Sequence, residues 1–462
     1  MARGARGLGA ACAAAGMARV IRAARALCAL ARLVALASVA AMTGMAALLL
    51  AALGAERSVA DAHAGGRPDS ESVAQSPLDI LRGGAPEEGF ARADAVRPFE
   101  FPRDHGPHPA FRHEWWYFTG HLQAADGEQF GFEVTFFRIA LAPPRSAAGL
   151  IEGGGIEGAS RWRARQIYVA HFAITDIGRR TFHSAQRFAR DALGLAGAQA
   201  APLRVWLGDW SVAAPGHAAA APDRQAAVPA HAGAAPDHAA ADVYAGNSGK
   251  SWILYAADSA YGLTLLLHPI SPPVLNGDRG LSIKSNEPGA ASYYYSIPRL
   301  GTHGKLVRGG RAIEVSGTTW LDREWGSGSL GPHQEGWDWF ALQLADGSAL
   351  MYYALRDRGG ARDPHSAGTW VDPAGRAHPL SGADVRIDVL DHWESPRGGR
   401  YPSRWRVRVD SIGLDIVVTP ALADQELHTT PRYWEGDVEV SGIQGGRPAS
   451  GRGYVELVGY TP

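Results

Sequence analysis

The sequence predicts an all-β protein made by duplication, folded as sandwiches or barrels. From residue 99 onward, short runs rich in Trp, Tyr, Phe, Val and Ile alternate with Gly, Asp and Pro breaks, as strands and turns do. No segment after residue 63 sustains a helical apolar period over three turns. An aromatic phrase also occurs twice, at residues 115–127 and 337–347. A repeat at domain-scale spacing indicates two related domains.

Each copy of this phrase predicts a β-hairpin. The first copy ends in Asp126-Gly127 and the second in Asp346-Gly347, and each runs into a further aromatic strand, at residues 130–139 and 350–356. An Asp-Gly step between two apolar runs favours a tight hairpin turn, because glycine readily adopts the positive φ that the turn requires.

Residues 1–62 are typical of a targeting leader. Six arginines precede an uncharged run at residues 33–55, and Ala60-Asp61-Ala62 offers a cleavage site. The run is also long enough to span a bilayer, so a retained membrane anchor is the alternative to a cleaved signal. We therefore expect export across the cytoplasmic membrane, to the periplasm or beyond the cell.

Composition excludes several functions. Both cysteines, Cys12 and Cys28, lie in the leader, so the remaining chain uses neither disulfides nor thiol chemistry. Without the leader the formal net charge is −6, and no Lys/Arg stripe is present, which argues against nucleic acid as a partner. No cofactor or metal motif is complete; His113-Glu114 could open a zinc-binding helix, but residue 117 is Tyr where a second His is required.

The rest of the chain divides into two predicted domains. Residues 63–95 are rich in Gly, Pro, Ser and Glu and predict a flexible lead-in. Residues 96–295 form the first domain, with a disordered Ala/Pro/His insertion at 213–242, and residues 296–462 form the second. The boundary is set where a Gly/His/Lys stretch follows Pro298.

Two clusters interleave charged and aromatic side chains. In the first, alternation along a strand puts His113, Trp115 and Tyr117 on one face and Glu114 and Trp116 on the other. In the second, Asp322 and Glu324 share a face opposite Arg323 and Trp325. Apolar walls around a carboxyl group raise its pKa and make it a useful proton donor. The structural alternative is that Arg323 pairs with Glu324 or Asp322 to tie strand ends together.

At these residues the sequence resembles the AttH-like proteins, which are related to carotenoid 1,2-hydratase (hydroxyneurosporene synthase). The phrases that carry the resemblance lie at residues 113–117, 171–176, 321–326 and 337–344. It implies an all-β fold of two tandem lipocalin-like β-barrel domains in a secreted bacterial protein. It also implies a hydratase or a hydrolase, and for some members a role beside ABC-type export systems with a permease and an ATPase.

The hydratase reaction sets requirements that this chain meets in part. An acid protonates an isoprenoid double bond, a tertiary cation forms, and water captures it. Where the resemblance implies Asp-His-Glu-Trp, residue 323 is Arg, which cannot donate a proton near neutral pH, and strand 350–354 has no acid. These departures argue against hydratase activity. The catalytic candidates are Asp322, Glu324, Asp338, His113 and Glu114.

Aromatic residues in the same clusters are the candidates for ligand binding: Trp115, Tyr117, Trp325, Trp337, Trp339 and Tyr352. We expect a Trp/Tyr-lined cavity in or between the barrels, without a cofactor, that holds an apolar small molecule such as an isoprenoid or another lipid. Three functions remain open: a lipid-transforming enzyme, a non-catalytic lipid carrier for an export system, and a hydrolase acting through residues 322–338.

Overall fold

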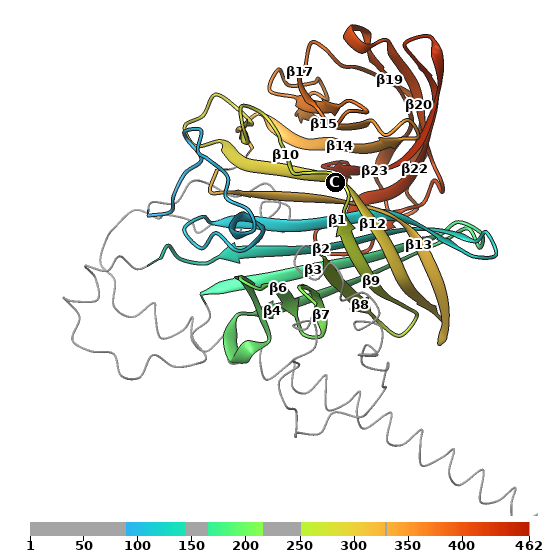
Figure 1. Ribbon diagram of the computed structural model, residues 1–462. Helices are drawn as coiled ribbons and strands as arrows, with labels where there is room; N and C mark the ends of the chain where they lie inside the picture. The colour runs from blue at the N-terminus through green and yellow to red at the C-terminus, as the bar shows by residue number, and fades with distance from the viewer. Residues whose placement is uncertain (1–88, 145–164, 216–250, 329, 462) are drawn as a thin grey trace, which may run out of the picture. The chain divides into compact units, whose positions relative to one another are not determined.

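The computed structural model describes residues 89–144, 165–215, 251–328 and 330–461, which form two antiparallel β-sheets with three short 3-10 helices (Figure 1). The first sheet contains β1 (His113–Ala124), β2 (Gln129–Ala140), β3 (Gln166–Asp176), β4 (Thr181–Arg190), β5 (Ala196–Ala200), β6 (Leu203–Leu207), β7 (Trp210–Ala213), β8 (Trp252–Ala257), β9 (Tyr261–Pro269), β10 (Val274–Leu275), β11 (Leu281–Ile283), β12 (Ala291–Arg308) and β13 (Arg311–Gly326). The second contains β14 (Gln334–Leu344), β15 (Ala349–Asp357), β16 (Ala367–Val371), β17 (Ala377–Ser381), β18 (Arg386–Glu394), β19 (Arg400–Val409), β20 (Leu414–Pro420), β21 (Glu426–Leu427), β22 (Tyr433–Gln444) and β23 (Arg447–Val458). The 3-10 helices are η1 (Arg103–His105), η3 (Ala192–Gly194) and η5 (Asp410–Ile412).

The two sheets share one topology. The first follows the order β4-β3-β2-β1-β13-β12-β9-β8-β7-β6-β5, and the second β17-β16-β15-β14-β23-β22-β20-β19-β18. In each sheet the opening strand pairs with the last one, β1 with β13 and β14 with β23. The all-β, tandem lipocalin-like prediction is therefore confirmed, with each sheet curled into a barrel.

The two predicted aromatic hairpins occupy equivalent places in these sheets. They are β1–β2 and β14–β15, both antiparallel. Gly127 and Gly347 lie at their turns with φ of 90° and 96°, as the Asp-Gly steps indicated.

The predicted boundary between the domains is wrong. A division at 295/296 would cut β12 (Ala291–Arg308) in two, and both β12 and β13 pair within the first sheet. The Gly/His/Lys stretch that suggested a linker, residues 301–305, lies inside β12 and pairs with β13 on one side and β9 on the other. The change of sheet falls between Gly326 and Gln334.

The predicted leader lies outside the described residues, as do residues 63–88 of the lead-in and 216–242 of the insertion. Residues 89–95 are described, and Phe90 and Ala93 are buried there, so the prediction of a flexible segment fails for this part. In the part of the chain that the structure describes, no helix has the length and hydropathy needed to cross a bilayer.

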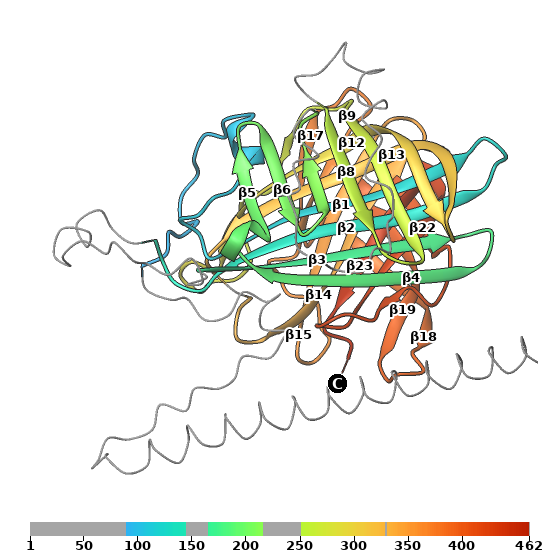
Figure 2. The same cartoon turned by 90° about the horizontal axis from the view of Figure 1, so that it is seen from below.

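Each barrel has its own core, and a third apolar cluster joins their outer faces. Trp116, Phe132 and Trp210 lie in the first core, and Phe340 and Trp405 lie in the second. The joining cluster includes Tyr117, Trp320, Trp339, Met351 and Tyr454. Figure 2 shows β1 and β2 running across the strands of the second sheet, and β1 contacts β23 while β2 contacts β22.

Candidate active site

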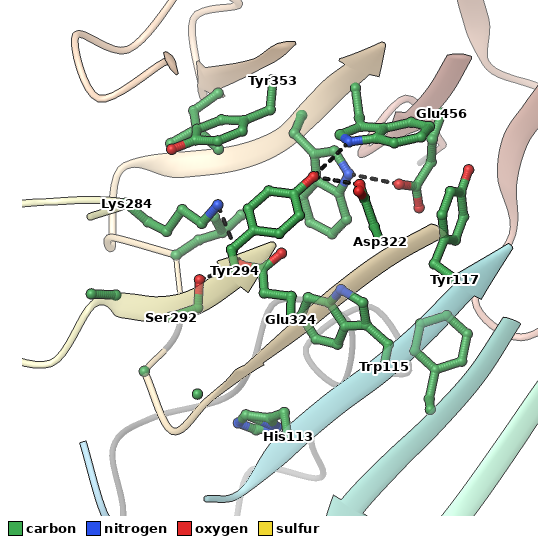
Figure 3. Close-up of a pocket in the computed structure, with 18 residues that line it drawn as sticks. His113, Trp115, Tyr117, Lys284, Ser292, Tyr294, Asp322, Glu324, Tyr353 and Glu456 are labelled. Carbon is green, nitrogen blue, oxygen red and sulfur yellow. Dashed lines mark hydrogen bonds and ion pairs between the residues drawn. The ribbon is translucent and has the colours of Figure 1, made fainter. Parts of the chain in front are cut away.

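A cavity of about 120 Å³ lies between the outer faces of the two barrels (Figure 3). Since one water needs roughly 10–15 Å³ by this kind of measure, the cavity can hold on the order of ten waters or a small organic molecule. The first sheet and the loop after β11 supply His113, Trp115, Tyr117, Phe137, Lys284, Ala291, Ser292, Tyr294, Asp322, Glu324 and Gly326. The second sheet supplies Trp337, Trp339, Tyr353, Leu355 and Glu456, while Gly328 and Leu330 come from the connection.

Asp322 is the buried acid at the centre of this cavity. Its carboxylate accepts hydrogen bonds from Ser296 at 2.5 Å, from Trp320 at 2.7 Å and from the Tyr294 hydroxyl. Burial, with the nearby charge of Glu324, raises its pKa from 3.8 to about 7 despite these donors. Trp339 of the second sheet in turn donates to the Tyr294 hydroxyl at 3.0 Å.

Glu324 lies two residues further along β13 on the same face. It accepts a hydrogen bond from Ser292, and the Lys284 ammonium lies 3.3 Å from its Oε1 atom. The Lys284 Nζ atom also lies 3.8 Å from the centre of the Tyr353 ring, a cation–π contact. Burial disfavours the charged ammonium, but Glu324 and Tyr353 outweigh this effect and raise the pKa of Lys284 above its usual value.

Glu456 faces the cavity from the other barrel. Trp337 Nε1 donates to its Oε2 atom at 3.1 Å. Burial raises the pKa of Glu456 to about 7, and the charges of Asp322 and Glu324 add to the effect. The cavity therefore has one proton-holding acid on each wall.

Two further acids lie behind Glu456. Tyr117 donates its hydroxyl hydrogen to Glu435, which pairs with Glu456 across β22 and β23. Glu133 on β2 has no hydrogen-bond partner for either carboxyl oxygen among the described residues. Burial raises the pKa of Glu133 to about 8 and that of Glu435 well above 4.5, because three like charges cannot all ionise without water.

His113 lies at the end of the cavity remote from Asp322 (Figure 3). Its side chain is buried, and neither ring nitrogen has a hydrogen-bond partner among the described residues. Burial, with Arg112 and Arg138 nearby, lowers the pKa of the imidazole to about 3, so the ring is neutral.

The model of the AttH-like family matches residues 92–460. The chain belongs to the AttH-like family. The resemblance found in the sequence is thereby confirmed.

This AttH-like chain is 31% identical to a structure assigned to AttH from Nitrosomonas europaea, with a TM-score of 0.65, covering 80% of this chain and 100% of that one. It is also similar to kievitone hydratase from Nectria haematococca, at 15% identity and a TM-score of 0.56, covering 84% and 99% of the two chains, which shows a shared fold. "Dehydratase asqC" of Emericella nidulans is 25% identical over 217 residues, or 42% of this chain. The match spans 57% of the length of that curated relative.

The AttH-like cavity brings together seven of the predicted site residues. They are Asp322, Glu324, His113, Trp115, Tyr117, Trp337 and Trp339. The two predicted alternation patterns put the five of these side chains that lie on β1 and β13 on one face of each strand, because successive residues of a strand point to opposite sides.

Four predicted site residues do not line the cavity. Asp338 points away from it and is held by Arg356 and Tyr460, each at 2.9 Å. Tyr352 belongs to the core of the second barrel and Trp325 to that of the first, where Trp325 stacks on His108. Glu114 is buried in an ion pair with Arg138 and Arg323. The alternation of side chains had already placed Glu114 and Trp325 on the opposite strand faces from the other candidates. Including these two residues in the site was therefore inconsistent with the predicted alternation.

Arg323 has the predicted structural role, but with a different partner. Its guanidinium lies 3.0 Å from Glu114 and bonds the backbone oxygens of Trp115 and Gly106 at 2.8 and 2.6 Å. Pairing with Asp322 or Glu324 is excluded because adjacent strand residues face opposite ways. Arg323 thus lies on the barrel-core side of β13, away from the cavity.

Some residues in and behind the cavity were not predicted from the sequence, namely Lys284, Tyr294, Tyr353, Glu456 and the two acids behind Glu456. Glu456 had a usable signal, since it alternates with Tyr454 in a predicted strand. The contact of Lys284 with Glu324 had none, because it depends on how the loop after β11 packs on β13. In the described residues, no group of three or more His, Cys, Asp or Glu is arranged to hold a metal ion.

Proposed function

We propose that this AttH-like protein is a hydratase or dehydratase that adds water to, or removes water from, a carbon–carbon double bond of an apolar ligand in the cavity between the barrels. The observation that carries the proposal is Asp322, a carboxyl group that holds its proton near pH 7 while facing an aromatic cavity. Such a group is an efficient general acid at neutral pH.

In the hydration direction, the Asp322 carboxyl group transfers its proton to one alkene carbon, and a carbocation forms at the other. Trp115 and Trp339 on facing walls stabilise the cation through their π faces. Water bonds to the cationic carbon and releases one proton to Glu324, the carboxylate paired with Lys284. Dehydration is the reverse, with Asp322 taking back the proton from carbon.

Tyr294 sets the orientation of the acid in this proposal. Its hydroxyl bonds one carboxyl oxygen of Asp322 and itself accepts a hydrogen bond from Trp339. The second barrel therefore orients the acid of the first.

The position of Arg323 bears on the argument that Arg in place of His at residue 323 speaks against hydratase activity. Arg323 occupies the place where the family resemblance implies His, but it lies on the core side of β13. Replacing His by Arg there leaves the acid face of β13 unchanged. Two similar proteins, one a hydratase and the other named as a dehydratase, favour the same chemistry.

Asp322→Asn tests the proposal, because asparagine can still accept from Ser296 and Trp320 but cannot supply the acidic proton. Farnesol and farnesene are incubated with the full chain in oxygen-18 water, and label incorporation is followed by mass spectrometry. We expect incorporation by the wild type and at least a ~100-fold lower rate in the variant.

Asp388→Asn, an exposed acid on β18, is the matched control and should keep the wild-type rate. Equal rates in the Asp322→Asn variant would contradict the assigned acid. Tight binding of either probe without labelling in the wild type would favour the alternative, a lipid carrier for an export system.

Export is part of the proposal as well. It is motivated by the arginine-rich leader before the uncharged run at residues 33–55. The mass of the protein recovered from the periplasm should match cleavage after Ala62; recovery of the full-length chain from the membrane would indicate an anchor, and recovery from the cytoplasm would contradict export.

A further inference from the structure

His113 is a cavity residue that the proposed reaction does not use. Its side chain is 5% exposed, and both ring nitrogens lack a hydrogen-bond partner among the described residues. A buried polar group without a partner costs free energy, so such a group at a cavity wall is normally satisfied by what fills the cavity.

The surroundings of His113 leave its ring open to the cavity. Its cross-strand partner on β13 is Gly326, which has no side chain to cover it. The charged groups near the imidazole are Arg112, Arg138 and Glu114, none of which lines the cavity. A neutral imidazole presents one N–H donor and one acceptor, a combination suited to a neutral oxygen.

The strand register places His113 well away from the acid. Asp322 pairs with Tyr117, and His113 lies four residues before Tyr117 on β1. At about 3.4 Å per residue, this separation is roughly 13 Å along the strand. Trp115, between these two positions on the same face, supplies an aromatic wall.

We propose that the ligand is an elongated apolar molecule with a neutral hydroxyl or carbonyl oxygen at one end, bound by His113, and its reacting double bond at the other end beside Asp322. This inference rests on the proposed function for the role of Asp322, but the recognition of oxygen by His113 stands on the cavity geometry alone. It excludes a pure hydrocarbon as the preferred ligand.

Binding of two probes that share a carbon skeleton tests the inference. The full chain is titrated with farnesol and with farnesene, and the dissociation constants are read from quenching of cavity tryptophan fluorescence. We expect the wild type to bind farnesol about 3- to 10-fold more tightly, the usual effect of one neutral hydrogen bond.

Three variants identify the group responsible. His113→Phe keeps a ring but removes both nitrogens, and should bring the ratio of the two dissociation constants to about 1 without weakening farnesene binding. His113→Gln restores a donor and an acceptor and should recover the preference. His392→Phe, an exposed histidine on β18, should leave the ratio at the wild-type value.

The inference is overturned by an equal affinity for both probes in the wild type, by failure of farnesol to bind, or by a preference that survives His113→Phe. The assay reads binding and not turnover. A protein that prefers farnesol through His113 yet incorporates no label would contradict the proposed function and leave this inference standing.

Discussion

At the scale of single residues, the proposed chemistry depends on carboxyl groups that keep their protons near pH 7, at which most carboxyl groups are ionised. Asp322 and Glu456 both have a pKa near 7, and each is set against indole groups, Trp320 for the first and Trp337 for the second. The sequence could predict Asp322, because it shares a strand face with Glu324 in a segment that tryptophans begin and end. The sequence could not predict that Glu456 lines the same cavity as Asp322. The two acids lie in different sheets, and no local pattern encodes how the sheets pack.

The pH dependence of turnover follows from Asp322. The proposed acid must be protonated, so kcat/KM for hydration should fall as the pH rises above about 7. Tyr294→Phe removes a donor that stabilises the ionised carboxylate and should move this fall to higher pH. Rate measurements from pH 5 to 9 check both effects. A fall that shifts to lower pH in the variant would contradict the role given to Tyr294.

At the scale of elements, the aromatic hairpins were the most predictable parts of the fold and the β12–β13 hairpin was the least. The Asp-Gly turns are short and lie between strongly alternating strands, so local chemistry determines them. Strand β12 of this hairpin contains Gly301 and Gly304 beside His303 and Lys305, and in sequence such a stretch has the composition of a linker. The mistaken domain boundary follows from that ambiguity.

Strand β2 carries an acid that should make stability depend on pH. Burial raises the pKa of Glu133 from 4.5 to about 8, so the folded chain binds this proton more tightly than the unfolded chain. Its stabilising contribution is complete below about pH 4.5 and is lost as the pH rises through 8. Glu133→Gln carries no ionisable proton and should be more stable than the wild type by about 5 kcal/mol at pH 9, with much less difference at pH 5.

Urea unfolding at the two pH values measures this difference. Glu314→Gln, an exposed acid on β13, is the control and should match the wild type at both. A Glu133→Gln variant that is less stable than the wild type at pH 9 would show that the carboxylate has a partner in the folded state.

At the scale of the whole described unit, the cavity lies between the barrels and not inside one. Aromatic residues occupy both faces of β1 and β13, one face in a barrel core and the other at the cavity, so composition alone could not indicate which face binds a ligand. Alternation separated the two faces correctly. It could not show that the second barrel covers one of them, because that depends on tertiary contacts.

Asp437 is one of the groups that hold the two barrels together. The Asp437 carboxylate bonds His121 of the first barrel at 2.6 Å and Arg452 of the second at 3.0 Å. Gly131 on β2 leaves room for this carboxylate, since a Cβ at residue 131 would lie 2.6 Å from the Asp437 side chain. Asp437→Ala removes the ring-nitrogen partner of buried His121 and the ion-pair partner of half-buried Arg452, and should lower the free energy of unfolding by about 3 kcal/mol.

The same substitution at Asp415, whose pair with Arg406 is exposed, should cost less than about 1 kcal/mol. Chemical unfolding followed by tryptophan fluorescence compares the two variants. Equal losses would mean that the bond between the barrels contributes no more than a surface ion pair.

The division of the cavity between two duplicated barrels has a consequence for how such proteins can diverge. Asp322 and Glu324 come with one copy and Glu456 with the other, while each copy keeps a separate apolar interior. Recombination that exchanges a single barrel therefore replaces one half of the ligand's surroundings and leaves the opposite acid in place. The ligand contacts made by one barrel can therefore change while those made by the other stay the same. Neither barrel has to change its fold for this to happen.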